Sequence, residues 1–192
     1  MKVLLYAAVV AVLLIVGLLG YGLSLDSHWR VERSAVIDAP QGPVFAYVSI
    51  LRNWPEWTVW NPQKYPSMKY SYGGSEWGVG ATQQWDDGAM QGMLRVTDYR
   101  PGEFMEYELV MEQGKFRMRG SLSIEPAGAG SRLTWACWGD SGGNPVNKLM
   151  MRFYRPMIAR DFNGGLANLQ QRLRADRSIQ PGAEHGGQDS QE

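Results

Sequence analysis

Residues 103–140 decide the fold: "EFMEYELVMEQGKFRMRGSLSIEPAGAGSRLTWACWGD". Apolar and polar side chains alternate through three runs, with the period of two that is typical of β-strands. The connections "QGK" and "PAGAGS" are short and contain glycine, which favours hairpins. Alternation gives each strand one bulky face, formed by Met105, Tyr107, Leu109 and Met111, by Phe116, Met118, Leu122 and Ile124, and by Leu133, Trp135 and Cys137. We therefore expect an antiparallel meander with one solvated and one covered face.

The strand pattern continues toward the N-terminus. Residues 30–38, "RVERSAVID", alternate as a strand with one mixed face, because Arg33 stands in the set of Val31, Ala35 and Ile37. Further strands are predicted in "MKYSY", "ATQQWD" and "MQGMLRVTDY" between Met68 and Tyr99. Between the first strand and these, "APQGPVFAYVSILRNW" has apolar residues at helical spacing. We expect two short helices after the first strand.

A long C-terminal helix is the element expected to cover the sheet. Asn144 is a suitable N-cap and Pro145 suits the first helical position. Pro156 should kink this helix or divide it in two. Its apolar positions recur at steps of three to five residues: Leu149, Phe153, Met157, Phe162, Leu166, Leu169 and Leu173. Together these elements predict an α+β helix-grip fold, a curved antiparallel sheet wrapped on the long C-terminal helix.

The N-terminal segment predicts a membrane span. Residues 3–25 carry no charge, and as a helix they would reach roughly 34 Å, enough to cross the hydrocarbon core. A cleaved signal peptide is the alternative, but its apolar stretch is usually shorter and ends in a small-x-small site. We expect an anchor in 1–26, a domain in 27–176 and a disordered tail in 177–192. The flanking charges nearly balance, with a weak preference for a cytoplasmic N-terminus and the domain outside.

Composition excludes several classes of function. The chain has 19 basic and 19 acidic residues, so no basic excess indicates nucleic-acid binding. The two histidines, His28 and His185, lie beside the anchor and in the tail, which excludes a histidine base inside the domain. Asp86 and Asp87 fit a turn, and no His/Cys cluster predicts a metal site. We expect no cofactor and no metal, identify no catalytic residue, and leave enzymatic activity open.

Three stretches carry a resemblance to a known family. "VERSAVIDAPQGPVFAYVSILRNWPEWTVWNP", "SRLTWACWGD" and "NPVNKLMMRFYRPMIARDFNGGLANLQQRL" closely resemble the SRPBCC superfamily, which includes START lipid-transfer and birch-pollen-allergen-like domains. The nearest likeness is to the bacterial polyketide cyclase/dehydrase type, many of which have an N-terminal membrane span. The likeness covers about residues 30–174. It implies a cavity between the sheet and the long helix that takes a hydrophobic ligand.

The resemblance places "LRNWPEWTVWNP" (51–62) over the mouth of that cavity. Trp60 would then lie at the mouth and Trp57 deeper, whereas Trp54 belongs either to the cavity wall or to the core. Packing alone is the alternative for each aromatic residue. The expected wall and rim of the cavity are Trp54, Trp57, Trp60, Tyr70, Tyr72, Trp85, Tyr107, Met118, Trp135, Phe153 and Met157.

Three hypotheses for function follow. The first is a membrane-anchored binding or transport domain whose partners are a hydrophobic small molecule or lipid and, through residues 3–25, the membrane. The second is a polyketide cyclase/dehydratase-type enzyme, which would need a carboxylate or arginine of perturbed pKa in the cavity. The third is a protein-interaction module, which would have a filled core and an exposed apolar patch.

Overall fold

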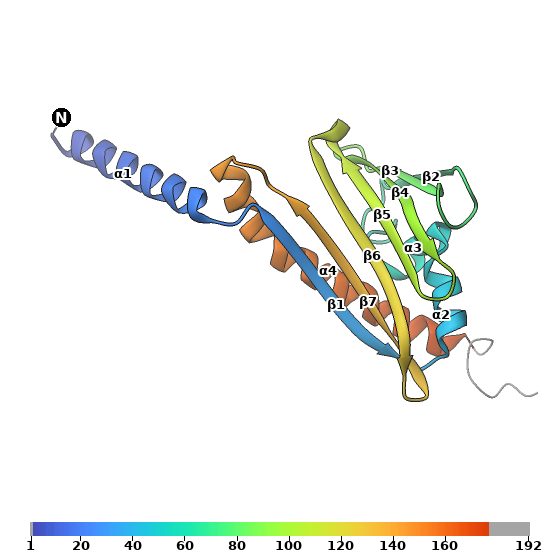
Figure 1. Cartoon of the computed structure of the whole chain (residues 1–192). Coiled ribbons are helices and arrows are strands. Elements are labelled where there is room, and N and C mark those ends of the chain that lie inside the picture. Colours follow the sequence, from blue (N-terminus) through green and yellow to red (C-terminus); the bar gives the residue numbers. More distant parts are fainter. Residues whose placement is uncertain (1, 177–192) are drawn as a thin grey trace, which may run out of the picture.

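The alternating segments form one seven-stranded antiparallel sheet with the order β1-β7-β6-β5-β4-β3-β2 (Figure 1). The computed structural model describes residues 2–176, so the predicted disorder of 177–192 lies outside the described residues. The strands are β1 (His28–Ile37), β2 (Lys69–Gly73), β3 (Thr82–Asp86), β4 (Gln91–Arg100), β5 (Phe104–Met111), β6 (Phe116–Ala127) and β7 (Gly130–Asp140). The meander expected from residues 103–140 is therefore confirmed, with β5, β6 and β7 as neighbours.

The helices are α1 (Lys2–Ser24), α2 (Gln41–Val48), α3 (Trp54–Trp57) and α4 (Pro145–Ala175), with 3-10 turns at Leu51–Asn53 and Glu112–Gly114. Of these, α2, α3 and α4 lie on one face of the sheet, as the helix-grip prediction requires, whereas α1 projects beyond the sheet (Figure 1). The core lies between α4 and the inner face of the sheet, where Met105, Leu122 and Leu133 are fully buried. On the outer face, Arg119 forms ion pairs with Glu106 and Glu108, as expected for the solvated face.

The long helix α4 begins as predicted and is continuous. The Asn144 side-chain oxygen accepts a hydrogen bond from the Val146 amide at 2.9 Å, the geometry of an N-cap. The division at Pro156 does not occur, because α4 runs as one helix through it. Pro156 is exposed, so water can hydrate the carbonyl that its missing N–H leaves unpaired.

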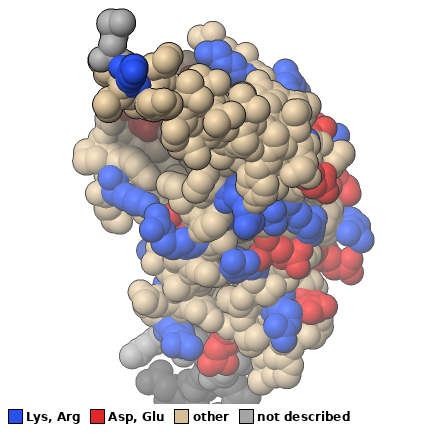
Figure 2. Space-filling model, turned by 90° about the vertical axis from the view of Figure 1, so that its left-hand side faces the viewer, with Lys and Arg blue, Asp and Glu red and all other residues tan. Residues whose placement is uncertain are grey.

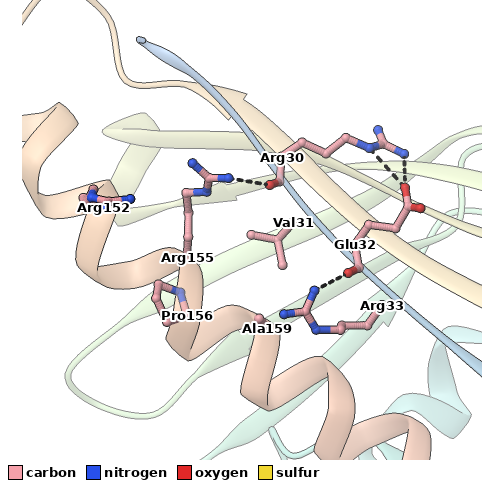
Figure 3. A pocket seen from close by; sticks show the side chains of 8 residues that line it. All are labelled: Arg30, Val31, Glu32, Arg33, Arg152, Arg155, Pro156 and Ala159. Carbon is pink, nitrogen blue, oxygen red and sulfur yellow. Dashed lines mark hydrogen bonds and ion pairs between the residues drawn. The ribbon is translucent and has the colours of Figure 1, made fainter. Parts of the chain in front are cut away.

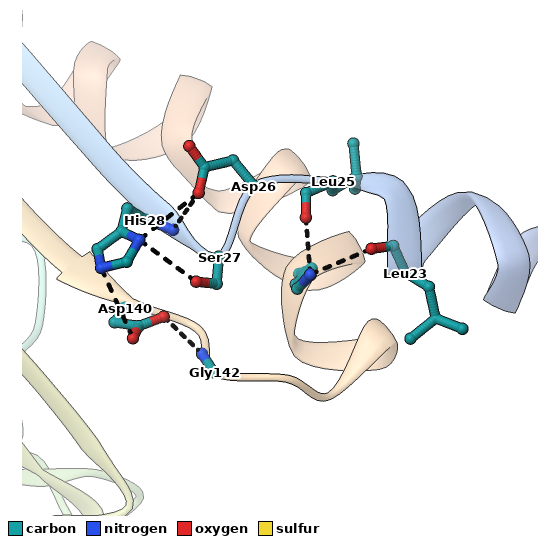
Figure 4. Close-up of polar contacts among 8 residues, drawn as sticks. Leu23, Leu25, Asp26, Ser27, His28, Asp140 and Gly142 are labelled. Carbon is teal, nitrogen blue, oxygen red and sulfur yellow. Dashed lines mark hydrogen bonds and ion pairs between the residues drawn. The ribbon is translucent and has the colours of Figure 1, made fainter.

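One end of α1 docks on the start of α4. Gly22 is the buried residue of α1, and a Cβ there would lie 2.7 Å from the Pro145 carbonyl oxygen. The Lys148 ammonium donates to the carbonyls of Leu23 and Leu25, at 3.3 and 2.7 Å (Figure 4). Most of the remaining α1 surface is exposed and apolar. The helix is long and apolar enough to cross a membrane, a property that a signal sequence shares.

Candidate functional site

Six aromatic side chains meet between the sheet and α4, and we call them the aromatic cluster: Trp54, Trp57, Trp60, Tyr107, Trp135 and Phe162. The Trp135 ring stacks on Phe162 with 4.0 Å between centroids, and its centroid lies 4.9 Å from that of Trp57. Trp60 meets the same pair edge-on, at 5.8 Å from Trp135 and 6.4 Å from Phe162. Residues from α3, the following loop, β5, β7 and α4 therefore build one apolar site.

Local sequence explains how the tryptophans reach this site. Pro55 occupies the first turn of α3, where its missing N–H costs no helical hydrogen bond. The Trp54 indole N–H donates to the carbonyl of Val48 at 2.8 Å, which ties α3 to the end of α2. Thr58 is extended and ends the helix after one turn. The chain then turns outward, so that Trp57 is buried and Trp60 is half-buried.

Two glycines make room for the cluster. A Cβ at Gly120 would lie 2.3 Å from the Tyr107 ring, so only glycine lets that ring lie over β6. A Cβ at Gly165 would lie 3.0 Å from the Trp135 ring. This glycine brings α4 close enough for Phe162 to stack on Trp135. Close backbone approach at both positions sets the shape of the site.

The indole N–H groups of the cluster are hydrogen-bond donors. The Trp135 indole N–H donates to the Tyr107 hydroxyl at 2.8 Å. The Trp57 indole nitrogen is buried, and among residues 2–176 it has no hydrogen-bond partner. A buried donor without an acceptor is costly, typically about 1–3 kcal/mol. The site can therefore offer a hydrogen bond to an oxygen of a bound molecule.

The titratable groups in and beside the cluster are held in their neutral forms. Burial raises the pKa of the Tyr107 phenol well above its ordinary value, although the hydrogen bond from Trp135 partly opposes the shift. Burial also raises the pKa of the Cys137 thiol to about 12. Neither group is a base or a nucleophile at neutral pH. No group of His, Cys, Asp and Glu within the described residues could hold a metal ion.

The structure brings together some of the predicted site residues and separates others. Trp54, Trp57, Tyr107 and Trp135 meet in the cluster, with Trp60 at its outer side. Half-buried residues pack around the core or over its edge: Tyr70, Tyr72, Trp85 and Met118. The Tyr70 hydroxyl donates to the Trp60 carbonyl at 2.7 Å, and burial raises the pKa of Tyr70 to about 12.

Phe153 and Met157 lie apart from the cluster. Their side chains are 73% and 49% exposed, on the first half of α4, together with exposed Val146 and Met150. These four residues follow the helix at steps of three and four, so they form one stripe. Helical spacing in the sequence shows that these residues share one face of the helix. It does not show that this face points away from the sheet.

Sequence reasoning missed two features. The first is Phe162, which belongs to the cluster. In the sequence it begins a series of apolar residues at helical spacing, all of them buried: Phe162, Leu166, Leu169 and Leu173. The second feature is a hollow of about 330 Å³ between β1 and α4, lined partly by arginines (Figure 3). The sequence feature that indicates this hollow is Arg33, a charged residue among the inward positions of β1. Another hollow, of about 270 Å³, lies beside Tyr72 and Arg52.

Comparison with solved structures shows the same fold. Ara h 8.0201 has a TM-score of 0.57 and 12% identity, with 78% of this chain and 99% of that chain covered. The Aha1 dimer from Colwellia psychrerythraea has a TM-score of 0.55 and 12% identity, over 76% of this chain and 96% of that chain. DynU16, from the dynemicin biosynthetic locus, has a TM-score of 0.55 and 13% identity, over 78% of this chain and 48% of DynU16. The present fold therefore spans about half of DynU16.

None of the curated proteins compared with this chain matches it. The match to a protein family is extensive, because it runs from the start of β1 almost to the end of α4. Residues 28–174 match the family described as "Polyketide cyclase / dehydrase and lipid transport", and the chain belongs to that family.

Proposed function

We propose that this protein binds a hydrophobic small molecule or lipid at the aromatic cluster and is held at a membrane by α1. The observation that carries the proposal is the buried Trp57 indole N–H, which has no acceptor among the described residues. An apolar site with one unsatisfied donor suits a largely hydrophobic molecule that carries a carbonyl or hydroxyl oxygen. The family description, which includes lipid transport, supports the same class of ligand.

Entry of the ligand requires the segment after α3 to move. Trp60 is half-buried and meets its neighbours edge-on, so its displacement exposes Trp135 and Phe162 without unfolding a strand. The segment is tied down by few polar contacts, among them the bond from Tyr70 to the Trp60 carbonyl. Segments with few contacts open at low free-energy cost. Trp60 therefore serves as the cover of the site and Trp57 as its floor.

A matched pair of probes tests the role of Trp57. 2-Acetylnaphthalene carries an acceptor oxygen, whereas 2-ethylnaphthalene has nearly the same shape without it. We expect the full chain in neutral detergent to bind the ketone about tenfold more tightly, since one hydrogen bond to a buried donor is worth about 1–1.5 kcal/mol. Trp57→Phe, which keeps a ring but removes the N–H, should abolish the preference. Equal binding of both probes by the wild type would refute the role of Trp57, and binding of neither would refute the site.

Membrane anchoring needs a separate test. We expect the full chain to stay in the membrane fraction after alkaline carbonate washing, whereas a chain with Leu13→Lys and Val16→Lys in α1 should be released. Charged residues at the middle of a span cost roughly 2.5–3.5 kcal/mol each on insertion scales. Recovery of a shortened chain lacking α1 would instead identify a cleaved signal sequence.

Protein interaction is a second candidate, favoured by the exposed stripe of Val146, Met150, Phe153 and Met157. Contiguous apolar patches on soluble surfaces commonly mark contact sites. Chemical cross-linking of the full chain in membranes should yield a partner adduct that the double variant Phe153→Ser/Met157→Ser loses. If the adduct survives in that variant, or none forms in the wild type, the stripe has no such role.

A further inference from the structure

The hollow between β1 and α4 combines a cationic rim with an apolar floor. Arg33 comes from β1 and Arg152 and Arg155 from α4, and Figure 3 shows their side chains around Val31, Pro156 and Ala159. Val31 and Ala159 are core residues, so the floor continues into the hydrophobic core. We call this site the arginine hollow. It opens at the side of the sheet and is separate from the aromatic cluster.

Arg33 departs from the pattern of its strand. The inward set of β1 is Trp29, Val31, Arg33, Ala35 and Ile37, of which Trp29, Val31 and Ile37 are buried. In the register of the sheet Arg33 pairs with the buried Trp135. The Arg33 side chain is nevertheless exposed, because β1 is the edge strand of the sheet. Inward-pointing charges on edge strands discourage pairing with other strands. From this position the Arg33 charge can also face an anion bound in the hollow.

Most of the positive charge in the hollow is uncompensated. The Arg30 guanidinium is turned away toward the Glu32 carboxylate, 2.6 Å away, and lies over the Trp138 ring. Arg33 and Arg155 instead donate to backbone carbonyls, those of Glu32 at 2.6 Å and Arg30 at 3.4 Å. Within residues 2–176, no carboxylate lies within 4.0 Å of the charged groups of Arg33, Arg152 or Arg155.

Further basic side chains lie on one face of the molecule. Figure 2 views the molecule from the side on which α1 lies in Figure 1. Lysine and arginine side chains form a band across this face, with acidic side chains interspersed on its right-hand side. The band is local, because the whole chain has equal numbers of basic and acidic residues. Clustered positive charge raises the local concentration of anions and speeds their binding.

We propose that the arginine hollow binds a phosphate group, carried by an amphiphile whose first carbon atoms cover Val31, Pro156 and Ala159. Guanidinium groups present planar pairs of N–H donors that match phosphate oxygens. The apolar floor explains why the ligand is an amphiphile and not a bare anion. The site does not depend on ligand binding at the aromatic cluster.

Three probes separate the possible sources of the phosphate: lysophosphatidic acid, monoacylglycerol of the same acyl chain, and inorganic phosphate. The first two differ only in the phosphate, so partition into detergent affects both alike. Binding to the full chain in a neutral detergent is measured by native mass spectrometry at increasing ligand fraction. We expect lysophosphatidic acid to bind at least about tenfold more tightly than monoacylglycerol, as expected for charge-assisted hydrogen bonds from two or more arginines.

The variants assign the binding to the hollow. Arg152→Gln/Arg155→Gln should reduce the affinity for lysophosphatidic acid about tenfold or more and leave that for monoacylglycerol unchanged. Both positions are exposed and glutamine is a good helix former, so α4 remains intact. Arg33→Gln tests the strand side alone. The control, Arg95→Gln/Arg117→Gln, removes the same charge from two exposed positions on the outer face of the sheet and should bind as the wild type does.

The outcomes are distinct. A preference for lysophosphatidic acid that disappears in the α4 variant but not in the control supports the site. Inorganic phosphate that binds as tightly as lysophosphatidic acid, with the same loss in the variant, supports the phosphate site but overturns the amphiphile. Equal binding of the two lipids by the wild type, or an equal loss in the control, overturns the proposal. If lysophosphatidic acid binds but 2-acetylnaphthalene does not, the proposal for the aromatic cluster fails and the proposal for the arginine hollow stands.

Discussion

At the scale of single residues, the tryptophans near α3 differ in how they are held. Trp54 is buried, donates its N–H to the Val48 carbonyl and meets Trp57, Tyr107 and Trp135 edge-on. Trp60 is half-buried and rests on the outer side of the same cluster. The first residue therefore supports the fold, whereas the second can move with little cost to the rest of the core.

We predict that Trp54→Ala destabilises the domain by about 3–5 kcal/mol, because it removes a large buried ring and leaves a cavity. Trp60→Ala should cost clearly less, since part of that ring is already solvated, and should weaken retention of hydrophobic ligands. Urea unfolding of both variants, followed by binding of the two naphthalene probes, checks this. Equal destabilisation by the two variants would show that Trp60 only packs against the core.

The buried thiol predicts a dependence of stability on pH. Burial raises the pKa of Cys137 from 9.0 to about 12, so the folded state keeps a proton that the unfolded chain loses above pH 9. Its contribution to stability is complete below pH 9 and declines as the pH rises toward 12, by up to about 1.4 kcal/mol per pH unit. Urea unfolding between pH 7 and 10.5 should show this decline.

The matched control for that decline is Cys137→Ala, which cannot ionise. In this variant the part of the decline that begins near pH 9 should be missing. The later part, from tyrosines such as Tyr70 and Tyr107 whose pKa values are also raised by burial, should remain. An unchanged profile in Cys137→Ala would exclude the thiol as the cause.

At the scale of elements, α4 has two halves with different surroundings. Its second half buries Phe162, Leu166, Leu169 and Leu173 against the sheet. Its first half docks on the end of α1 and presents an apolar stripe to solvent. The β5–β6 hairpin shows a similar division. Met105 and Leu122 are fully buried, whereas Phe116 at the far end is 48% exposed, because the sheet extends beyond the helices there.

These surroundings predict unequal effects along one helix. Leu169→Ala should cost about 2–5 kcal/mol, since Leu169 is fully buried, whereas Met157→Ala should change stability by less than about 1 kcal/mol. Both changes replace a large apolar side chain by the best helix former, so helix propensity does not account for the difference. Thermal unfolding of the two variants measures this difference in stability. A large loss for Met157→Ala would mean that another surface covers the stripe.

At the scale of the whole molecule, the contact between α1 and α4 sets how the domain sits relative to the N-terminal helix. Gly22 allows the helices to touch, and Lys148 binds two carbonyls at the end of α1. The domain therefore begins directly at the end of the apolar helix. Arg152 lies about 10 Å along α4 from the contact at Pro145. A ligand that leaves a bilayer spanned by α1 would meet this side of the domain first.

We predict that Gly22→Leu releases this contact without unfolding the domain. The new side chain would collide with the Pro145 backbone, so the ends of the two helices must separate and Lys148 loses its partners. Limited proteolysis of the full chain in detergent should show faster cleavage at residues 25–27, with an unchanged melting temperature. Gly20→Leu is the matched control, because nothing lies within 4 Å of that position. Equal cleavage in both variants would argue against docking through Gly22.

The sequence by itself determined the strands, the hairpins, the capped C-terminal helix and the family, because these depend on local periodicity and turn chemistry. It also indicated that the tryptophans of residues 54–60 lie near the sheet. Only the tertiary structure decided which face of α4 each apolar residue occupies. Phe153 and Phe162 look alike in the sequence, yet the first is exposed and the second stacks on Trp135. The physical reason is that a periodic pattern defines a face, whereas burial depends on which distant element packs against it. The missing hydrogen-bond acceptor of Trp57 and the gathering of arginines from β1 and α4 likewise depend on which distant elements pack together.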